Sequence, residues 1–363
     1  MKQVSLDNSL ELLEEYRGSG SSVFTKRFQS AILISSLGEP LEVHDNHPIP
    51  NLDEFEVLIE NKAIGLNPVD WKSKKYGFSI YSFPWVNGRE SSGVIVKQGD
   101  RVTEDLIGKK VFLASTSYRD NRTSTFQEYT VMDSRLVWEL PEKLSFEEGA
   151  TLGVGLVTAG ALLYDSFGID FADRESNLGK SIVIWGGSSV VGIYATQLAS
   201  IAGFSVISVA SRRNQKLLES LGASLVVDRH QNPSAIFQQT LELAPNGLDF
   251  GIDCVSKETS LNVVDLLKLS FDISGKVAKF AGIVGVPRTI PWEVEPVEVT
   301  IKRFHENVEY GEMFVRNTSM LLHEGTLKPV RQKKFFGGIE MIIAGLEDLE
   351  SFGASAEKYV VSI

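Results

Sequence analysis

The sequence predicts an α/β fold in which a β-rich region is followed by a doubly wound parallel sheet. Up to about residue 155, short β-like segments alternate with turn residues, which is typical of a compact β-rich domain. From about residue 156, strands and helices alternate, and this pattern favours a parallel sheet with helices on both faces. The expected β segments span residues 31–35, 56–63, 93–98, 110–114 and 125–131, and the later strands lie near residues 182, 205, 225, 250 and 277.

The two ends of the chain differ from these regions. Residues 1–28 are expected to form an N-terminal extension, in which leucines at helical spacing predict a short helix before a Gly/Ser-rich linker. Its acidic residues and its lack of an apolar core argue against a targeting peptide. Residues 336–346 predict a further helix and residues 359–363 a final strand, and we expect this end to return to the first domain.

Composition narrows the classes of function. The chain of 363 residues has 36 basic and 47 acidic residues, and the net charge of −11 argues against binding to nucleic acid or to an anionic membrane surface. With a mean hydropathy of −0.01, a soluble globular protein without a membrane span is expected. Cys254 is the one cysteine, so neither an internal disulfide nor a multi-cysteine zinc site is expected. The cytosol is the expected location, and the nucleus stays open as an alternative.

The most informative stretch is SIVIWGGSSVVG, residues 181–192. It predicts a buried strand, a tight turn and a helix start, and backbone N–H groups at a helix start bind the pyrophosphate of a dinucleotide. The usual three glycine positions correspond to Gly187, Ser189 and Gly192, so Ser189 must fit beside the phosphates or hydrogen-bond to one. A plain strand-to-helix connection is the alternative. The candidate cofactor-binding residues of this turn are Gly187, Ser188, Ser189, Val190 and Val191.

The end of the next expected strand indicates which dinucleotide is bound. An NAD site usually has an acidic residue there, whereas an NADP site has small polar and basic residues that accept the 2′-phosphate. This chain has Ser211, Arg212, Arg213 and, one helical turn later, Lys216. A guanidinium binds a phosphate through two parallel donors, so NADPH is the expected cofactor. The alternative is a solvated helix start, although basic groups are unfavourable at that end of a helix.

Several further motifs carry a family resemblance. They are GLNPVDWK at 65–72, GRESSG at 88–93, FQEYTV at 126–131, LSFEEGATLGVGL at 144–156, GGSSVVG at 186–192 and SAEKYVVSI at 355–363. With them, the sequence resembles the zinc-independent quinone and enoyl reductase branch of the medium-chain dehydrogenase/reductase superfamily, especially fungal trans-enoyl reductases. The resemblance implies a GroES-like catalytic domain over residues 29–155 and 311–363, an NADPH-binding Rossmann domain over 156–310, and a cleft between them. It also implies a monomer or a homodimer.

Two positions depart from the zinc enzymes of this superfamily. By the resemblance, Asn67 stands where those enzymes have a catalytic cysteine, and Arg89 where they have the histidine of a Gly-His-Glu run. An amide and a guanidinium cannot replace a thiolate and an imidazole as zinc ligands. The five histidines have no spacing that indicates another site. No metal site is therefore expected.

The chemistry that remains is hydride transfer from NADPH to an activated C=C bond or to a quinone. Negative charge then develops on the conjugated oxygen, and the protein supplies orientation and hydrogen-bond donors. By the resemblance, the segment from Asn67 to Tyr81 borders the nicotinamide. Asn67 is a candidate donor, Lys72 a candidate for stabilising an enolate, and Tyr76 or Tyr81 a candidate proton donor. A turn asparagine, a solvated lysine and packing aromatics are the alternatives.

Other candidates lie on the cofactor side. Thr158 matches a family threonine near the nicotinamide, although a helix-interior threonine bonded to its own backbone is a competing interpretation. Open parallel sheets bind ligands at the carboxyl ends of their strands, and the residues expected there are Cys254, Val255, Gly282 and Ile283. Two alternative functions stay open. One is an NADP(H)-binding regulatory or scaffold protein with little catalysis, and the other is an enoyl reductase acting in trans with a synthase partner.

Overall fold

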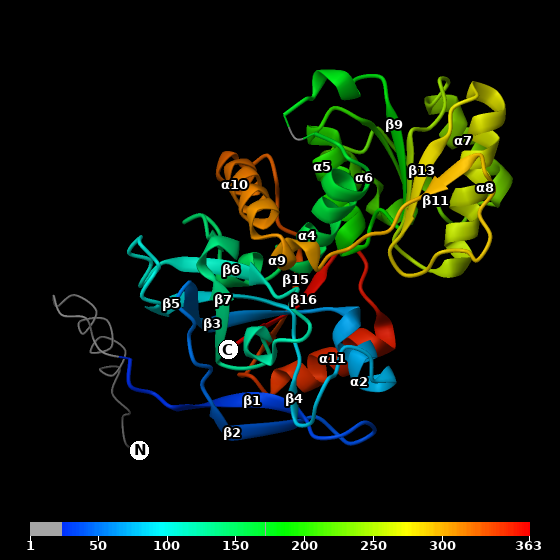
Figure 1. Ribbon diagram of the computed structural model, residues 1–363. Coiled ribbons are helices and arrows are strands. Elements are labelled where there is room, and N and C mark those ends of the chain that lie inside the picture. Colours follow the sequence, from blue (N-terminus) through cyan, green and yellow to red (C-terminus); the bar gives the residue numbers. More distant parts are fainter. Residues whose placement is uncertain (1–23, 171) are drawn as a thin grey trace, which may run out of the picture.

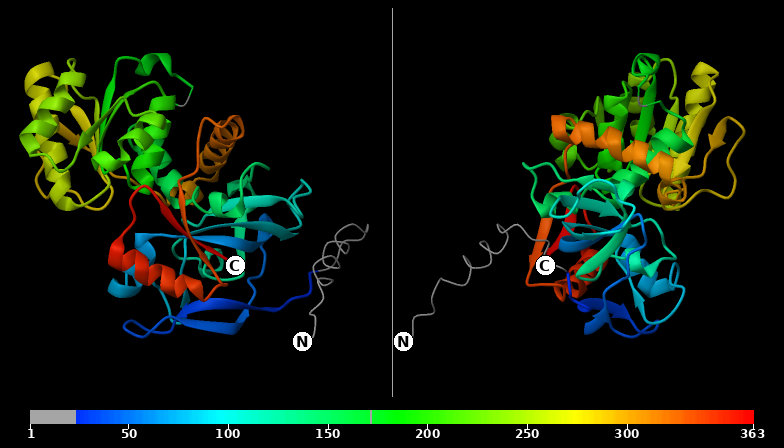
Figure 2. Two further views of the ribbon diagram at one scale, coloured as in Figure 1. Left: turned by 180° about the vertical axis from the view of Figure 1, so that it is seen from behind. Right: turned by 60° about the vertical axis from the view of Figure 1, so that its left-hand side comes forward.

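The computed structural model describes residues 24–170 and 172–363, which form a β-rich body and a parallel-sheet body (Figures 1 and 2). The helix expected near the N-terminus lies outside the described residues. The α/β fold expected from the sequence is confirmed, with a GroES-like β-rich part and a Rossmann-like parallel sheet. The boundaries of the two expected domains stay a prediction.

The parallel sheet has six strands in the order β11-β10-β9-β12-β13-β14. Every adjacent pair is parallel. The chain runs from the central β9 outward to β10 and β11 and then returns to β12, so the strand order reverses beside β9, where such sheets bind ligands. The strands are β9 (Ser181–Trp185), β10 (Ser205–Ala210), β11 (Leu225–Asp228), β12 (Phe250–Asp253), β13 (Ala278–Gly282) and β14 (Val294–Pro296).

Helices cover both faces of this sheet because side chains of a strand alternate between its faces. In β9, Ile182 and Ile184 join the core under α5 and α6, whereas Val183 and Trp185 join the core under α7 and α8. Figure 1 shows α5 and α6 on one side of the sheet and α7 and α8 on the other. These helices are α5 (Val190–Ile201), α6 (Gln215–Ser220), α7 (Pro233–Leu243) and α8 (Lys257–Ser274), and the short η6 (Arg212–Asn214) precedes α6.

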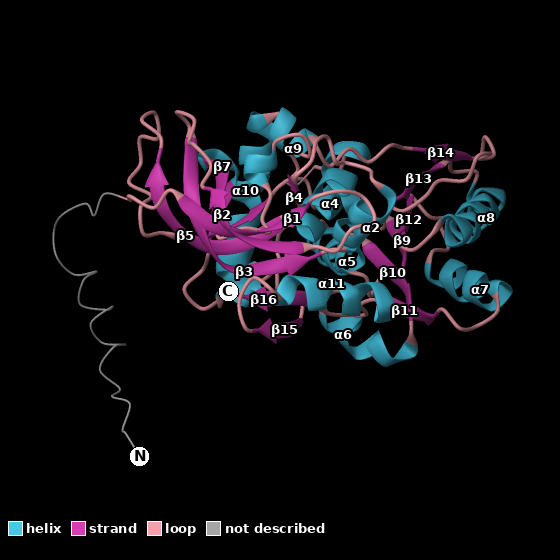
Figure 3. Cartoon of the chain, turned by 90° about the horizontal axis from the view of Figure 1, so that it is seen from below, coloured by secondary structure: helices cyan, strands magenta, loops and turns pink. Residues whose placement is uncertain are grey.

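The β-rich body is built from segments far apart in the sequence. Its larger sheet has the order β15-β16-β3-β5-β6-β8, and β7 also pairs with β3. The last strand lies antiparallel to β3, so the end of the chain returns to this body, as expected (Figure 3). The strands are β3 (Glu56–Leu66), β5 (Glu90–Gln98), β6 (Lys110–Ala114), β7 (Tyr129–Asp133), β8 (Val137–Glu139), β15 (Gln332–Phe336) and β16 (Lys358–Ser362).

A second, three-stranded sheet has the order β2-β1-β4, and an apolar core lies between it and the larger sheet. Ile32 of β1, Ile64 of β3 and Ile342 of α11 all belong to this core. Its strands are β1 (Phe28–Ile34), β2 (Glu42–Pro48) and β4 (Trp85–Val86), and the helices beside it are α2 (Pro68–Tyr76) and α11 (Met341–Phe352). The sequence predicts that last helix over 336–346, but Gly337 and Gly338 have φ of 137° and 100°, which a helix cannot accommodate.

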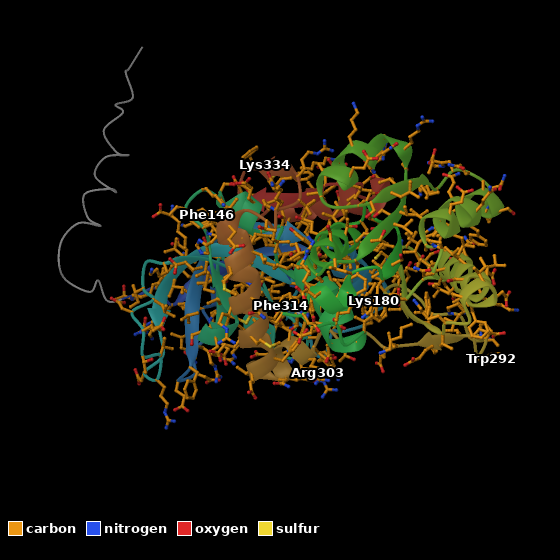
Figure 4. The ribbon with its side chains drawn as sticks, turned by 90° about the horizontal axis from the view of Figure 1, so that it is seen from above. Phe146, Lys180, Trp292, Arg303, Phe314 and Lys334 are labelled. Atoms are coloured by element: carbon orange, nitrogen blue, oxygen red, sulfur yellow. The ribbon has the colours of Figure 1, made fainter. Side chains whose placement is uncertain are left out.

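The two bodies share one continuous core. Trp138 stacks on Phe112 and Phe304, with ring centroids 5.0 and 5.4 Å apart, and Phe314 packs edge-on against it. Figure 4 places Phe314 between the two bodies and Trp292 at the outer end of the parallel-sheet body. The remaining helices are η2 (Asn121–Thr123), η3 (Ser134–Leu136), α3 (Phe146–Gly149), α4 (Val154–Gly160), the π-helical η4 (Ala161–Ser166), η5 (Glu175–Asn177), α9 (Arg303–Glu306) and α10 (Val308–Glu324).

The helical stretch Phe146–Ser166 runs through this shared core. Among the described residues, it alone is long and apolar enough to cross a membrane by length and composition. However, 78% of its most apolar window is buried inside the protein. Its apolar residues are therefore accounted for by packing between the two bodies.

Candidate functional site

A cavity of about 650 Å³ lies where the two bodies meet. Its walls come from the start of α2, from α4, from the turn into α5, from the ends of β12 and β13, and from the start of β16. Most of the lining is apolar, including Leu66, Val154, Val190, Ile283 and Ile301. A mostly apolar cavity with a few placed polar groups is typical of a small-molecule site.

The turn between β9 and α5 has the close packing that the glycine pattern predicts. A Cβ on Gly187 would lie 2.7 Å from Ser208 Oγ, and a Cβ on Gly192 would lie 2.3 Å from the carbonyl oxygen of Gly186. Ser189, the departure from the glycine pattern, is the N-cap of α5, and its Oγ accepts a hydrogen bond from the Gly192 N–H at 3.0 Å. Its side chain therefore stabilises the helix start while it lines the cavity.

A loop from the C-terminal segment crosses onto this turn. The backbone N–H of Ala356 donates to the carbonyl oxygen of Ser188 at 2.9 Å. Asn214 Nδ2 of η6 donates to Ser355 Oγ at 3.1 Å. Of the turn residues predicted to bind the cofactor, Ser189, Val190 and Val191 line the cavity, whereas Gly187 and Ser188 are not among its lining residues.

The basic residues predicted to bind a 2′-phosphate lie at the carboxyl end of β10. Arg212, Arg213 and Lys216 are exposed, and no described acidic side chain forms an ion pair with them. Ser211 is joined by two further groups, since Arg229 Nε donates to its Oγ at 2.9 Å and His230 Nε2 lies 3.4 Å away. No sequence motif marks Arg229, but it directly follows β11, and the carboxyl end of a parallel strand is where such sheets bind ligands.

A buried polar network forms the opposite wall of the cavity. Asn67 Nδ2 donates to Glu90 Oε1, and Lys358 Nζ donates to Asn67 Oδ1, both at 2.6 Å. Lys358 also forms an ion pair with Glu90, and their side chains are 2% and 0% exposed. The other oxygen of Glu90 accepts the backbone N–H of Val154 at 2.8 Å. Asn67 thus lines the cavity. Glu90 and Lys358 come together with it only because β5 and β16 both pair with β3.

Arg89 and Asp70 are a second pair of buried charged residues near this network. Arg89 is 1% exposed, and its guanidinium carbon lies 4.5 Å from the centroid of the Tyr118 ring. Its Nη1 and Nη2 atoms have no hydrogen-bond partner among the described residues. Burial raises the pKa of the Asp70 carboxyl to about 7, against the opposing effects of the Asn67 backbone N–H and of the Arg89 charge. Burial also lowers the pKa of Arg89.

The other catalytic candidates are not all brought together. Lys72 lines the cavity, and its Nζ lies 5.5 Å from the centroid of the Trp71 ring. Tyr76 and Tyr81 are 65% and 55% exposed and are not among the lining residues. Tyr118 does line it, and no motif in the sequence indicates this.

The cofactor-side candidates fall into two groups. Thr158, Cys254, Gly282 and Ile283 line the cavity. Val255 is not among the lining residues, and its N–H donates to Asp253 Oδ1 at 2.9 Å. Thr158 Oγ1 donates to the carbonyl oxygen of Val154 at 2.7 Å, so its hydroxyl is bonded to the backbone of its own helix. Burial raises the pKa of the Cys254 thiol to about 12.

Comparison with known proteins shows the family. The model of the alcohol dehydrogenase GroES-like domain matches residues 53–142, and that of the zinc-binding dehydrogenases matches residues 190–289. The trans-enoyl reductase himH of Aspergillus japonicus is 36% identical over 323 residues, which cover 85% of this chain and 90% of that protein. The chain belongs to the enoyl and quinone reductase branch of the medium-chain dehydrogenase/reductase superfamily. The trans-enoyl reductase fsa3 of a Fusarium species is 27% identical, over 92% of this chain and 99% of that protein.

Solved structures of this superfamily share the fold. An alcohol dehydrogenase superfamily protein from Novosphingobium aromaticivorans has a TM-score of 0.76 at 19% identity, covering 92% of this chain and 99% of that one. A mycobacterial protein solved in complex with NADPH has a TM-score of 0.73 at 20% identity, covering 92% and 100%. As a member of this superfamily, the chain is an oxidoreductase with a site for a nicotinamide cofactor.

Although one of the matching models is named for zinc binding, the residues of this reductase do not fit a zinc ion. Lys358 places a cationic group against Asn67, the charge of Arg89 acts on the nearby Asp70, and Glu90 already pairs with Lys358. A zinc ion would meet like charge there and neither thiolate nor imidazole ligands. Across residues 24–170 and 172–363, no group of three or more His, Cys, Asp or Glu side chains could hold a metal ion. We therefore derive no step through a metal.

Proposed function

We propose that this protein is an NADPH-dependent, zinc-independent reductase of activated C=C bonds or quinones. One observation carries the proposal: a single, mostly apolar cavity joins the phosphate-binding turn of α5 to the buried network of Asn67, Glu90 and Lys358. The turn suits a dinucleotide, the apolar walls suit a hydrocarbon, and the polar network suits one oxygen atom. A domain division at residues 155 and 311, a cytosolic location and a monomer or homodimer are parts of the same proposal.

The residues at the cofactor side fit NADPH. Gly187 and Gly192 let the chain turn closely into α5, whose first N–H groups and the Ser189 hydroxyl would hold the pyrophosphate. Arg212 and Arg229 would hold the 2′-phosphate, because both are cationic and an acidic residue is missing at the end of β10. When bound, the reduced nicotinamide supplies a hydride to the substrate.

The chain itself would bind and orient the substrate. Apolar side chains such as Leu66, Val154 and Ile301 would enclose the hydrocarbon and exclude water, so that the few polar groups act at low dielectric. The network around Asn67 would face the conjugated oxygen, on which negative charge develops during reduction. Lys72 would supply a second cation on the same wall, and Tyr118 is the candidate proton donor in place of Tyr76 and Tyr81, which do not line the cavity.

A trans-acting enoyl reductase is the second candidate function, and the relatives favour it. Several of the most similar curated proteins are named trans-enoyl reductases. The cavity walls also suit an alkyl chain. In this case the substrate would be an acyl chain carried by a partner synthase, and small free enones would react slowly.

A thermal-shift comparison of NADPH with NADH, followed by a turnover screen, tests the proposal. A ligand that binds only the folded protein raises its melting temperature by mass action. We expect a larger rise with NADPH, and NADPH oxidation with enones or quinones. Turnover only with carrier-bound acyl chains would select the trans-acting candidate. Tight NADPH binding with no turnover on any acceptor would favour a regulatory or scaffold protein and contradict the reductase proposal.

A further inference from the structure

The buried network leaves two hydrogen-bond donors unused at the cavity wall. An ammonium has three N–H donors, and Lys358 Nζ uses two of them on Asn67 Oδ1 and Glu90. A side-chain amide has two N–H donors, and Asn67 Nδ2 uses one of them on Glu90 Oε1. Among the described residues, Lys358 Nζ has no third partner and Asn67 Nδ2 has no second one. Both residues line the cavity.

We infer that Lys358 Nζ and Asn67 Nδ2 together form an oxyanion-binding pair for the carbonyl oxygen of the substrate. The inference rests on the proposed reduction. In that reaction, the β-carbon accepts a hydride and NADPH becomes NADP⁺. The C=C electron pair moves to bond the α-carbon to the carbonyl carbon, and the C=O π pair moves to the oxygen, which becomes an enolate. Tyr118, the proposed proton donor, then protonates the α-carbon as the C=O bond reforms, and its phenolate recovers a proton from water.

Glu90 makes this pair rigid, which is the property that distinguishes it from an ordinary surface lysine. Its carboxylate contacts Lys358, Asn67 and the backbone of Val154, so it ties β16, α2 and α4 to β5. Donors fixed before the reaction cost no reorganisation when charge develops, and they act most strongly where water is excluded. The buried carboxylate also balances the ammonium charge, which would otherwise be too costly to bury.

Lys72, the other lysine at the cavity, lacks these restraints. Its Nζ lies 5.5 Å from the Trp71 ring centroid, and no described carboxylate pairs with it. A free lysine must lose side-chain entropy to meet a transient oxyanion. The network therefore assigns the conjugated oxygen to Lys358 and Asn67 in preference to Lys72.

A phenol probe tests the pair without requiring turnover. The phenolate of 4-nitrophenol resembles an enolate oxygen and absorbs differently from the neutral phenol. With the full chain and NADP⁺ present, we expect the bound probe to be at least about tenfold richer in phenolate than the free probe at the same pH. Removing a preorganised donor costs about 100-fold or more in kcat, so turnover of an enone should fall by that factor in a Lys358 variant while the Kd for NADPH holds.

The variants are chosen so that folding does not confound the result. Lys358→Met alone leaves the Glu90 charge buried and unpaired, so the charge-balanced double variant Lys358→Met/Glu90→Gln is the main test. Lys276→Met is the matched control, because it removes a lysine ion-paired with Asp249 outside the cavity. We expect the phenolate preference and the enone turnover to fall in the double variant and to hold in the control.

Three results would overturn either the oxyanion-binding pair or the proposed reduction. A wild-type protein that shows no phenolate preference, or a folded double variant that keeps the preference and the turnover, overturns the oxyanion pair. A wild-type protein that reduces no acceptor but shows a phenolate preference that the double variant loses supports the pair and overturns the proposed reduction.

Discussion

Lys358 at the start of β16 and Glu90 at the start of β5 form an ion pair that is almost completely shielded from solvent. Removing one partner of such a pair is strongly destabilising, because a charge is left buried and unpaired. This pair stands next to Asn67 and Arg89, the positions where the family's zinc enzymes have metal ligands. In this chain, the ammonium group of Lys358 supplies a fixed positive charge at this wall of the cavity.

Asp70 makes stability depend on pH. Burial raises the pKa of its carboxyl to about 7, above the ordinary value of 3.8, so the folded state holds the proton more tightly than the unfolded state. The resulting stability is fully present below about pH 4 and is lost as the pH rises through about 7. We expect the free energy of unfolding of the wild type to fall by roughly 2–3 kcal/mol relative to Asp70→Asn between about pH 5 and pH 8. Urea unfolding of both proteins measures this, and parallel pH profiles would contradict the shift.

In the proposed function, Arg212 and Arg229 bind the 2′-phosphate, so both are expected to favour NADPH over NADH. Replacing either with Ala removes a cation from the end of β10 or β11, and we expect a loss of about tenfold or more in NADPH affinity with little change for NADH. Titration calorimetry with both cofactors measures the two affinities. Arg101→Ala is the control, because this exposed arginine pairs with Glu54 in the β-rich body. Equal losses of affinity for NADPH and NADH would contradict a role for these arginines in binding the 2′-phosphate.

Cys254 is expected to be an unreactive thiol. Burial raises the pKa of this thiol to about 12, and the thiolate is the form that attacks alkylating agents. At about pH 8, iodoacetamide should therefore modify the native protein far more slowly than the urea-unfolded protein. Mass spectrometry gives a clear answer because the chain has a single cysteine. We also expect Cys254→Ser to keep its turnover, and rapid modification with loss of turnover would show a catalytic thiol instead.

Ser189 is expected to stabilise the folded protein because it caps the N-terminus of α5. Its Oγ accepts the Gly192 N–H, and losing such a cap to alanine costs about 1 kcal/mol, whereas glycine costs only a few tenths. We expect Ser189→Ala to be less stable than Ser189→Gly in chemical unfolding, although alanine is the better helix former. The reverse order would mean that the hydroxyl contributes nothing to the helix start.

Much of the fold follows from local sequence patterns. The alternation after residue 156 predicts all five strands near residues 182, 205, 225, 250 and 277, because buried parallel strands leave short apolar runs between helices. The helix expected over 336–346 begins later, at Met341, since Gly337 and Gly338 end β15 in a turn. The three-residue β14 has too short a signal to be found.

The candidate site follows from the sequence only in part. Local motifs indicate Asn67 and the glycine turn between β9 and α5, because a turn and a helix start are encoded by adjacent residues. Lys358 and Glu90 meet Asn67 only after β3, β5 and β16 pair in one sheet. Tyr118 reaches Arg89 from the loop that follows β6. Tyr76 and Tyr81 stayed candidates because sequence proximity to Asn67 does not tell which side chains face the cavity.

Transfer of a deuterium label from the reduced nicotinamide to the product shows directly whether this protein reduces an activated C=C bond by hydride transfer. The protein is mixed with NADPH carrying deuterium at the transferring carbon and with an α,β-unsaturated ketone or acyl thioester, and the product is analysed by NMR. We expect deuterium at the β-carbon, with protein shown by elemental analysis to hold no stoichiometric zinc. Deuterium at the carbonyl carbon, or no transfer to any acceptor in a broad panel that includes carrier-bound acyl chains, would contradict the proposed reduction.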